Sequence, residues 1–319
     1  MAVYTHVSAE TLSALLEHYD AGSLVSAKGI AEGVENSNYL VDTTTSRFIL
    51  TLYEKRVDSA DLPFFMALLD HLAGKGLPVP RAIADRSGKQ IQEVAGRPAC
   101  LIEFLPGVSV SHPTPAQGRA AGVALGQMHA ALVDFGGART NALGAGDWRD
   151  LAERCGADLD AIAPGLRARV MNELDWLDQA WPRHLPKSVI HADLFPDNVL
   201  MRGNSVSGII DFYFACRDVR AWDVAVTHAA WCFENDGEGF HPHRAAALIA
   251  GYDEGFGLSA EERAAFTALA RGACLRFLLT RAWDWLNTAA DALVTRKDPL
   301  AFLRRLDFYR DADPAELGL

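Results

Sequence analysis

The stretch VIHADLFPDNVLM, residues 189–201, places acidic, histidine and amide side chains between two short apolar runs. The apolar runs predict short buried strands, and Asp193 and Asn198 then lie on the loop between them. A second stretch, SGIIDFYF at residues 207–214, carries Asp211 directly after a pair of isoleucines. We expect the strand that ends at Asp211 to pair back beside this loop, so that three oxygen-bearing side chains meet.

These three side chains suit one kind of chemistry. Carboxylate and amide oxygens are the ligands that Mg²⁺ prefers, when water and phosphate complete its coordination shell. A further carboxylate can accept the proton of an attacking hydroxyl group during phosphoryl transfer. Asp and Asn between strands also cap turns, and a histidine such as His191 is often structural, so the motif gains meaning only from its context.

The composition limits the partners. The 319 residues include 30 Lys and Arg against 41 Asp and Glu, which gives a net charge of −11. Such a surface repels nucleic acid and anionic lipid, so we expect a small-molecule substrate, no nucleic acid and no membrane. Five scattered cysteines without a CxxC motif are typical of free thiols in a reducing compartment. Without a signal segment or an apolar stretch of about 18 residues, the sequence predicts a cytoplasmic protein.

The first hundred residues predict a small sheet with helices. Ser8 is expected to cap a helix whose apolar positions continue at helical spacing to Tyr19. Short β-rich stretches in residues 23–54 predict a three-stranded antiparallel meander, followed by a helix at 61–76. Residues 79–107 predict further antiparallel strand that ends at a Pro-Gly break.

The rest of the chain predicts mostly helix. Thr114, Pro115 and Gln117 are an N-cap, an N1 proline and an N3 glutamine before an apolar, alanine-rich helix. Further helices are expected at about 165–181, 219–234, 241–256 and 259–289, and short β segments at 188–191, 198–202 and 206–212. The sequence therefore predicts an α+β fold with two lobes, residues 1–104 and residues 105–319, and a hinge near 103–107.

The two quoted stretches resemble a known fold. HADLFPDN followed by IIDF matches the H-x-D-x-x-x-x-N and D-F pair of the protein-kinase-like fold, in the small-molecule branch that holds aminoglycoside phosphotransferases and choline kinases. The resemblance implies that Asp193 is the catalytic base, that Asn198 and Asp211 hold Mg²⁺, and that His191 braces the loop. In the stretch RDVRAWDVAV it implies that Asp223 supports the loop from below.

A closer resemblance covers most of the chain. GIAEGVENSNYLV, FILTLYEKR, LAGKGLPVP and VIHADLFPDNVLM are similar to the homoserine kinases of this fold. This implies ATP-dependent phosphorylation of the side-chain hydroxyl of L-homoserine to O-phospho-L-homoserine, a step toward threonine. It also implies that residues 1–104 bind the nucleotide, with EGVENSN over the ATP phosphates and EFLPG against the adenine. The implied nucleotide contacts are Gly29, Gly33, Ser37, Asn38, Glu103 and Leu105.

One departure from the wider fold concerns two charged residues. Protein kinases pair a lysine of the third strand with a helix glutamate, and this chain has Thr51 and Phe65 at those places. Losing both charges together avoids leaving one charge unpaired in a partly dry site. Lys28, Lys55 or backbone amides are left as alternatives for the phosphate contact.

The acceptor site is expected on the helix at 259–289. Arg281 and Trp285 are four residues apart and share a face, so Arg281 can grip a carboxylate with two hydrogen bonds, and Arg276 is a second candidate. Ordinary helix packing explains the same residues equally well. A choline, methylthioribose or aminoglycoside kinase remains an alternative function, as does a catalytically silent nucleotide-binding module. The sequence leaves the oligomeric state open.

Overall fold

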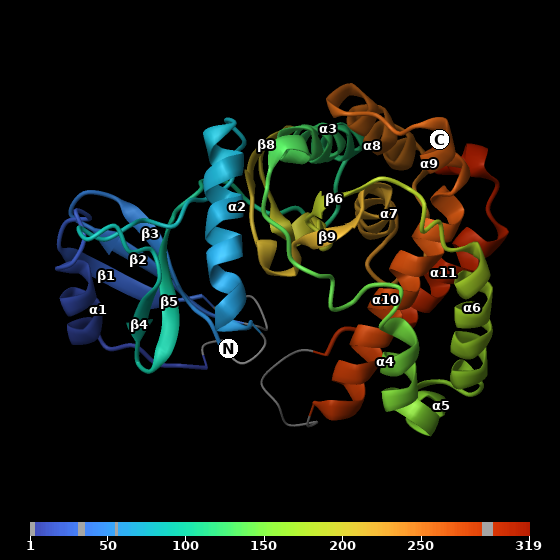
Figure 1. Ribbon diagram of the computed structural model, residues 1–319, viewed down its shortest axis with the longest axis horizontal. Helices are drawn as coiled ribbons and strands as arrows, with labels where there is room; N and C mark the ends of the chain where they lie inside the picture. The colour runs from blue at the N-terminus through green and yellow to red at the C-terminus, as the bar shows by residue number, and fades with distance from the viewer. Residues whose placement is uncertain (1–3, 31–35, 55–56, 289–295) are drawn as a thin grey trace. The chain divides into compact units, whose positions relative to one another are not determined.

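The computed structural model describes residues 4–30, 36–54, 57–288 and 296–319 (Figure 1). The chain divides into two units, and each is described by itself. The first comprises Met1–Pro106 with Gly208–Tyr213, and the second Gly107–Ser207 with Phe214–Leu319. The short Gly208–Tyr213 segment, which the sequence analysis assigned to the second lobe, thus packs with the first unit.

The first unit is built on a five-stranded antiparallel sheet in the order β1-β2-β3-β5-β4. The strands are β1 Leu24–Gly29, β2 Ser37–Thr43, β3 Arg47–Leu52, β4 Gln92–Val94 and β5 Arg97–Glu103. The predicted meander is confirmed, because β1, β2 and β3 pair in succession. Buried and partly exposed residues alternate along β2, so one face of that strand is buried.

Two helices accompany the sheet, α1 Ala9–Leu16 and α2 Leu62–Gly74. The Ser8 side chain accepts a hydrogen bond from the backbone nitrogen of Thr11, which confirms the predicted N-cap. The apolar residues of α1 share one buried cluster with residues of the sheet such as Val41 and Leu50. This burial follows from the helical spacing of the α1 leucines.

The second unit is mainly helical. Its helices are α3 Pro115–Ala131, α4 Trp148–Cys155, α5 Leu159–Ile162, α6 Leu166–Ala180, α7 Arg220–Trp231, α8 Pro242–Gly255, α9 Ala260–Ala264, α10 Phe266–Asn287 and α11 Leu300–Asp311. The capping box of Thr114 and Gln117 is present at the start of α3, as predicted. None of the helices within the described residues has the length and apolarity needed to cross a membrane.

The helices of the second unit are closely packed in two places, α7 on α10 and α3 on α8. Every residue of α7 from Ala221 to Trp231 is buried. Helix α7 lies against α10 and beside a small sheet of β6, Lys187–Ile190, and β9, Cys216–Val219 (Figure 1). Helices α3 and α8 pack so closely that a Cβ atom at Gly122 would lie 2.1 Å from the backbone oxygen of Leu248. Packing this close leaves little room for α3 and α8 to shift relative to one another.

Two expectations about this unit were wrong in detail, and one strand was not predicted. The helix expected at 259–289 is two helices, because α9 ends at Ala264 and Ala265 separates it from α10. The strand β6, Lys187–Ile190, pairs with an unpredicted strand β9, Cys216–Val219. The strand expected at 206–212 is β8, Ser205–Ile209, which pairs with β7, Val199–Arg202, and ends before Asp211.

Candidate active site

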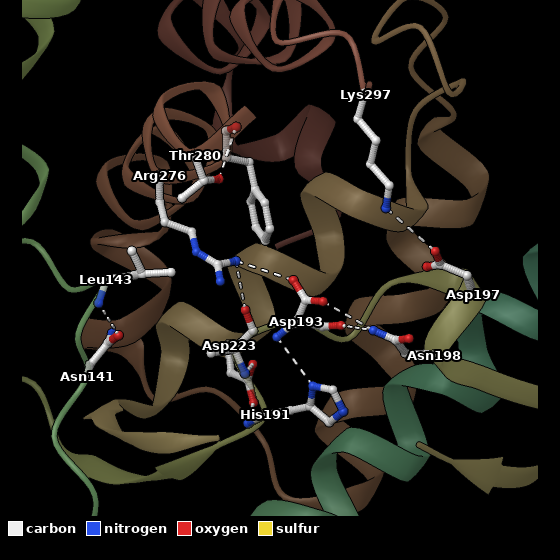
Figure 2. A network of polar contacts seen from close by, with 12 residues as sticks. Asn141, Leu143, His191, Asp193, Asp197, Asn198, Asp223, Arg276, Thr280 and Lys297 are labelled. Atoms are coloured by element: carbon white, nitrogen blue, oxygen red, sulfur yellow. Dashed lines mark hydrogen bonds and ion pairs between the residues drawn. The ribbon is translucent and has the colours of Figure 1, made fainter. Parts of the chain in front are cut away.

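The loop between β6 and β7, residues 191–198, brings two of the predicted site residues together (Figure 2). The side-chain nitrogen of Asn198 donates to the backbone oxygen of Asp193 at 2.8 Å and to Asp193 Oδ2 at 3.2 Å. The amide nitrogen is therefore used inside the loop. The amide oxygen of Asn198 is the atom suited to a hard cation such as Mg²⁺.

The start of this loop is held in an unusual backbone conformation. His191 is fully buried, and its Nδ1 accepts a hydrogen bond of 3.3 Å from the backbone nitrogen of Asp193. Ala192 has a φ of 63°, in the left-handed region that costs a residue with a Cβ about 1–2 kcal/mol. Such a conformation persists only where the surroundings hold it in place.

The surroundings that hold it come from α7. The buried carboxylate of Asp223 accepts hydrogen bonds of 2.8 Å from the backbone nitrogens of His191 and Ala192. Its Oδ2 also lies 3.1 Å from Nε2 of His129, whose Nδ1 is 2.9 Å from the hydroxyl of Tyr252. Burial alone would raise the pKa of Asp223, but the histidines and the backbone amide bring it below the usual value. Asp223 is a buried anion that anchors the loop.

His129 and Tyr252 were missed by the sequence analysis. Both are buried, and they extend the contact of Asp223 into α3 and α8. A weak signal was present, because a histidine within the apolar run LGQMHAAL needs a hydrogen-bond partner if its helix is buried. The sequence did not say which residue that partner is.

The two arginines expected to bind the acceptor lie differently on α10. Arg276 is 2% exposed, and its guanidinium group faces the loop, 3.1 Å from the backbone oxygen of Ala192 and 3.4 Å from Asp193 Oδ1. Arg281 is partly exposed, stacks 4.5 Å from the centre of the Phe302 ring and donates to the backbone oxygen of Asp298 at 3.1 Å.

The surroundings of Arg281 change the pKa of its guanidinium group. Burial, and secondarily the nearby Arg305, lower the pKa of Arg281 to about 10, while Asp193 is the first of three carboxylates that oppose this shift. Two of these carboxylates, Asp193 and Asp197, belong to the loop. Trp285, the third predicted acceptor residue, is covered by the guanidinium group of Arg296 at 4.6 Å.

The predicted nucleotide residues belong to the first unit. The Ser37 hydroxyl accepts from the backbone nitrogen of Tyr4 at 2.8 Å and donates to Glu54 at 2.7 Å. Gly29 is the last residue of β1 and pairs with Tyr39, while Gly33 and Lys55 lie outside the described residues. The Ser37 side chain is thus already bonded within its unit.

The predicted adenine contacts, Glu103 and Leu105, lie at and just beyond the end of β5. The backbone nitrogen of Glu103 donates to the oxygen of Arg81, and its carboxylate accepts from the nitrogen of Arg81 at 3.1 Å. Leu105 is partly buried. Their contact with a nucleotide stays a prediction.

Neutral side chains stand at the two positions where protein kinases have a strand lysine and a helix glutamate. The hydroxyl of Thr51 donates to Asn38 Oδ1 at 2.7 Å. Phe65 of α2 packs edge-on against Tyr213 at 5.7 Å, and the Tyr213 hydroxyl lies 3.3 Å from that of Tyr53. Burial raises the pKa of Tyr213, so the phenol stays neutral. These contacts leave no buried charge at Thr51 or Phe65.

Asp211 also lies in the first unit, in the segment that leads to Tyr213. It is exposed and has a φ of 65°. The residues before and after it are fixed, because Ile209 donates to the backbone oxygen of Pro78 at 2.8 Å and Tyr213 contacts Tyr53. The meeting of Asp211 with Asp193 and Asn198 stays a prediction.

Comparison with known proteins adds three findings. A model described as the phosphotransferase enzyme family matches residues 26–266. The chain is 58% identical to a homoserine kinase of Zymomonas mobilis over 100% of both proteins, and 53% identical to one of Methylorubrum populi over 99% of this chain and 98% of that protein. A solved amicoumacin kinase has a TM-score of 0.73 and 16% identity, over 97% of this chain and 95% of that one. The expected kinase-like α+β fold is confirmed.

Proposed function

This chain belongs to the phosphotransferase enzyme family, and we propose that it transfers the γ-phosphoryl group of ATP to the side-chain hydroxyl of L-homoserine. The observation that carries the proposal is the identity of more than half of all residues with homoserine kinases, along the whole chain. The product is O-phospho-L-homoserine. Solved choline and aminoglycoside kinases are similar to this chain in fold at 15–18% identity, which supports those alternatives far less than the full-length identity supports homoserine.

Asp193 is the base in this proposal. A carboxylate offers about four lone-pair sites. Asn198 and Arg276 each occupy one site, on different oxygens, so sites remain for the proton of the acceptor hydroxyl. General-base assistance of this kind typically contributes about 10²–10⁴-fold to the rate.

Asn198 and Asp211 are the proposed Mg²⁺ ligands. One amide oxygen and one carboxylate oxygen form a hard donor set of the kind that Mg²⁺ accepts beside phosphate and water. The Asn198 amide oxygen and the Asp211 carboxylate would hold the ion, and it would supply positive charge that offsets the negative charge developing on the transferred phosphoryl group. Asn198 is held ready for this role because its nitrogen is bonded to Asp193.

The nucleotide is assigned to the first unit, with Gly29, Gly33, Ser37 and Asn38 near the phosphates and Glu103 and Leu105 near the adenine. The side chains of Ser37 and Asn38 are hydrogen-bonded to Glu54 and Thr51. We therefore assign these two residues a supporting role within β2 rather than a direct side-chain contact with phosphate. Backbone amides then replace the missing strand lysine in binding phosphate oxygens.

Arg281 is the proposed partner of the homoserine carboxylate. It is partly exposed and electrostatically coupled to Asp193, and a guanidinium group binds a carboxylate with two parallel hydrogen bonds. Trp285 lies one turn further along the same face of α10. Its ring is already covered by Arg296, so it is the weaker candidate.

A coupled assay of ADP release tests the function. The purified protein would be supplied with Mg-ATP and, separately, L-homoserine, choline, methylthioribose and kanamycin. We expect the highest kcat/KM with L-homoserine. A higher kcat/KM with any other acceptor would reject the proposed substrate, and no release with any acceptor would reject the kinase activity.

A further inference from the structure

Arg276 has a position that acceptor binding does not explain. It lies in the buried part of α10, and its Nη1 is shared between two atoms of the 191–198 loop, the backbone oxygen of Ala192 and Oδ1 of Asp193 (Figure 2). The side chain is almost completely removed from solvent, with 2% exposure. Both of these polar contacts are made to the loop.

The guanidinium group is also held by aromatic rings. Its central carbon lies 3.9 Å from the centre of the Phe277 ring and 5.0 Å from that of Phe214. A planar cation on an aromatic face has few alternative orientations. Burying a charge in this way is costly and is weak evidence for a role in stability. A fixed orientation of the guanidinium group beside Asp193 would give this buried charge a role other than stability.

The oxygen atoms of Asp193 are each restrained from a different side. Asn198, within the loop, donates to Oδ2, and Arg276, from α10, contacts Oδ1. The backbone is restrained in the same manner, because Asp223 accepts from the nitrogen of Ala192 while Arg276 donates to its oxygen. Removing Arg276 would release the carboxylate of Asp193 and also Ala192, whose backbone is in the left-handed conformation.

We propose that Arg276 is a positioning residue, which fixes the carboxylate of Asp193 and the Ala192–Asp193 peptide in the orientation needed to receive the acceptor proton. The inference rests on the proposed function, in which Asp193 is the base. It separates two arginines that the sequence had treated as alternatives. Arg276 acts on the enzyme's own loop, and Arg281 acts on the substrate.

The first test is the kinetics of Arg276→Met, which keeps the length and apolar bulk of the side chain. Since a misplacement of about 1 Å can cost about a hundredfold in rate, we expect kcat to fall between about ten- and a hundredfold. KM for L-homoserine and for ATP should change less than about threefold, because no substrate contact is lost. A rise in KM for homoserine at unchanged kcat would overturn the proposal and make Arg276 a substrate contact.

A matched control lies on the same helix. Arg271 is also buried and stacked on an aromatic ring, at 3.3 Å from the centre of Trp176, but it pairs with Glu173 on α6. Arg271→Met should lower the midpoint of thermal unfolding without lowering kcat, when both are assayed well below that midpoint. An equal loss of kcat in both variants would mean that Arg276 acts only through stability.

Two further variants test the proposal even if Arg276→Met folds poorly. Arg276→Lys keeps a charge near the loop and should retain more of kcat than Arg276→Met. Arg276→Ala leaves space, so millimolar ethylguanidinium should restore part of its lost kcat, while the same additive should not raise that of Arg271→Ala. Rescue absent from Arg276→Ala, together with kcat in Arg276→Lys no higher than in Arg276→Met, would overturn the positioning role.

A double variant shows through which residue Arg276 acts. In the Asp193→Asn background, adding Arg276→Met should change the residual kcat by less than about threefold, since residues that act as a unit are not additive. Fully multiplicative losses would overturn the inference. A normal rate in Asp193→Asn alone would instead reject the proposed base, which is a separate result from the kinetics of Arg276→Met.

Discussion

Oδ2 of Asp223 lies 2.8 Å from the backbone nitrogen of His191, a residue thirty-two positions earlier in the chain. The contact joins the buried helix α7 to the start of the 191–198 loop. The same carboxylate holds Ala192 and is itself met by His129 from α3. Hydrogen bonds to an ionised acceptor are stronger than neutral ones, so Asp223 is a strong anchor for the start of the loop.

Replacing Asp193 by asparagine should abolish most turnover and leave ATP binding nearly intact. Asparagine has nearly the same shape but does not accept a proton, and the expected loss in kcat is about 10²–10⁴-fold. Steady-state kinetics and a nucleotide titration measure the two effects. Asp197→Asn, on the exposed side of the same loop, is the control and should stay active. An undiminished rate in Asp193→Asn would reject Asp193 as the base.

Asp211→Ala should weaken the binding of Mg-ATP more than that of ATP alone. The carboxylate is proposed to touch the metal, and its removal deletes a hard ligand without changing the adenine site. Calorimetric titration with and without Mg²⁺ gives the difference. Asp70→Ala removes an exposed carboxylate from α2 in the same unit and should leave both affinities unchanged. Equal affinities for Mg-ATP in Asp211→Ala and the parent would count against the metal role.

A truncated acceptor should separate recognition of the carboxylate from catalysis. 3-Amino-1-propanol keeps the hydroxyl and ammonium groups of homoserine but lacks the carboxylate that Arg281 is proposed to bind. An unpaired charged hydrogen-bond partner costs roughly 1–3 kcal/mol, which is about ten- to a hundredfold in kcat/KM. Arg281→Met should shrink this preference by impairing the use of homoserine alone. Equal losses for both acceptors would make Arg281 a packing residue.

Gly122→Ala should destabilise the second unit. A Cβ atom there would lie 2.1 Å from the backbone oxygen of Leu248, so α3 and α8 must move apart. Overpacking of this kind typically costs about 1–3 kcal/mol. Chemical unfolding measures the change in the free energy of unfolding. Gly74→Ala, at the end of α2 with open space around it, is the control and should be neutral or slightly stabilising.

The stability should fall as the pH drops below about 6.5 because of His228. Burial lowers the pKa of His228 to about 4, so the unfolded chain takes up this proton at a higher pH than the folded one. The stabilising contribution of neutral His228 is complete above about pH 6.5, the pKa of histidine in the unfolded chain, and is lost towards pH 4. The free energy of unfolding falls by about 2 kcal/mol between pH 7.5 and 5.

Urea unfolding of the parent and of His228→Gln at pH 7.5 and pH 5 tests this dependence. The glutamine variant should be less stable at pH 7.5, because the substitution disturbs the contacts of His228 with Tyr309 and with the backbone oxygen of Leu317. It should nevertheless lose less stability between the two pH values. The same loss in both proteins would assign the pH dependence to other groups.

Much of the local structure was predictable because it depends on neighbouring residues. The caps at Ser8 and Thr114 and the meander of β1, β2 and β3 follow from side chains close in sequence. Strand β9 was missed, because CRDV has neither alternation nor an apolar run, and it is a strand through its pairing with β6. Pairing partners this far apart in sequence are fixed by the packing of the whole unit.

By itself, the sequence determined the chemistry that is available, an acid and an amide five residues apart on a loop and a second acid eighteen residues beyond the first. Only the tertiary structure decided what holds the first acid. Arg276 and His129 contact the loop or its support across 83 and 94 residues of chain. Helical periodicity indicates which face of a helix is buried, but not which charged group lies opposite. That choice is made when the helices pack, since a buried charge is stable only where its partner is already in place.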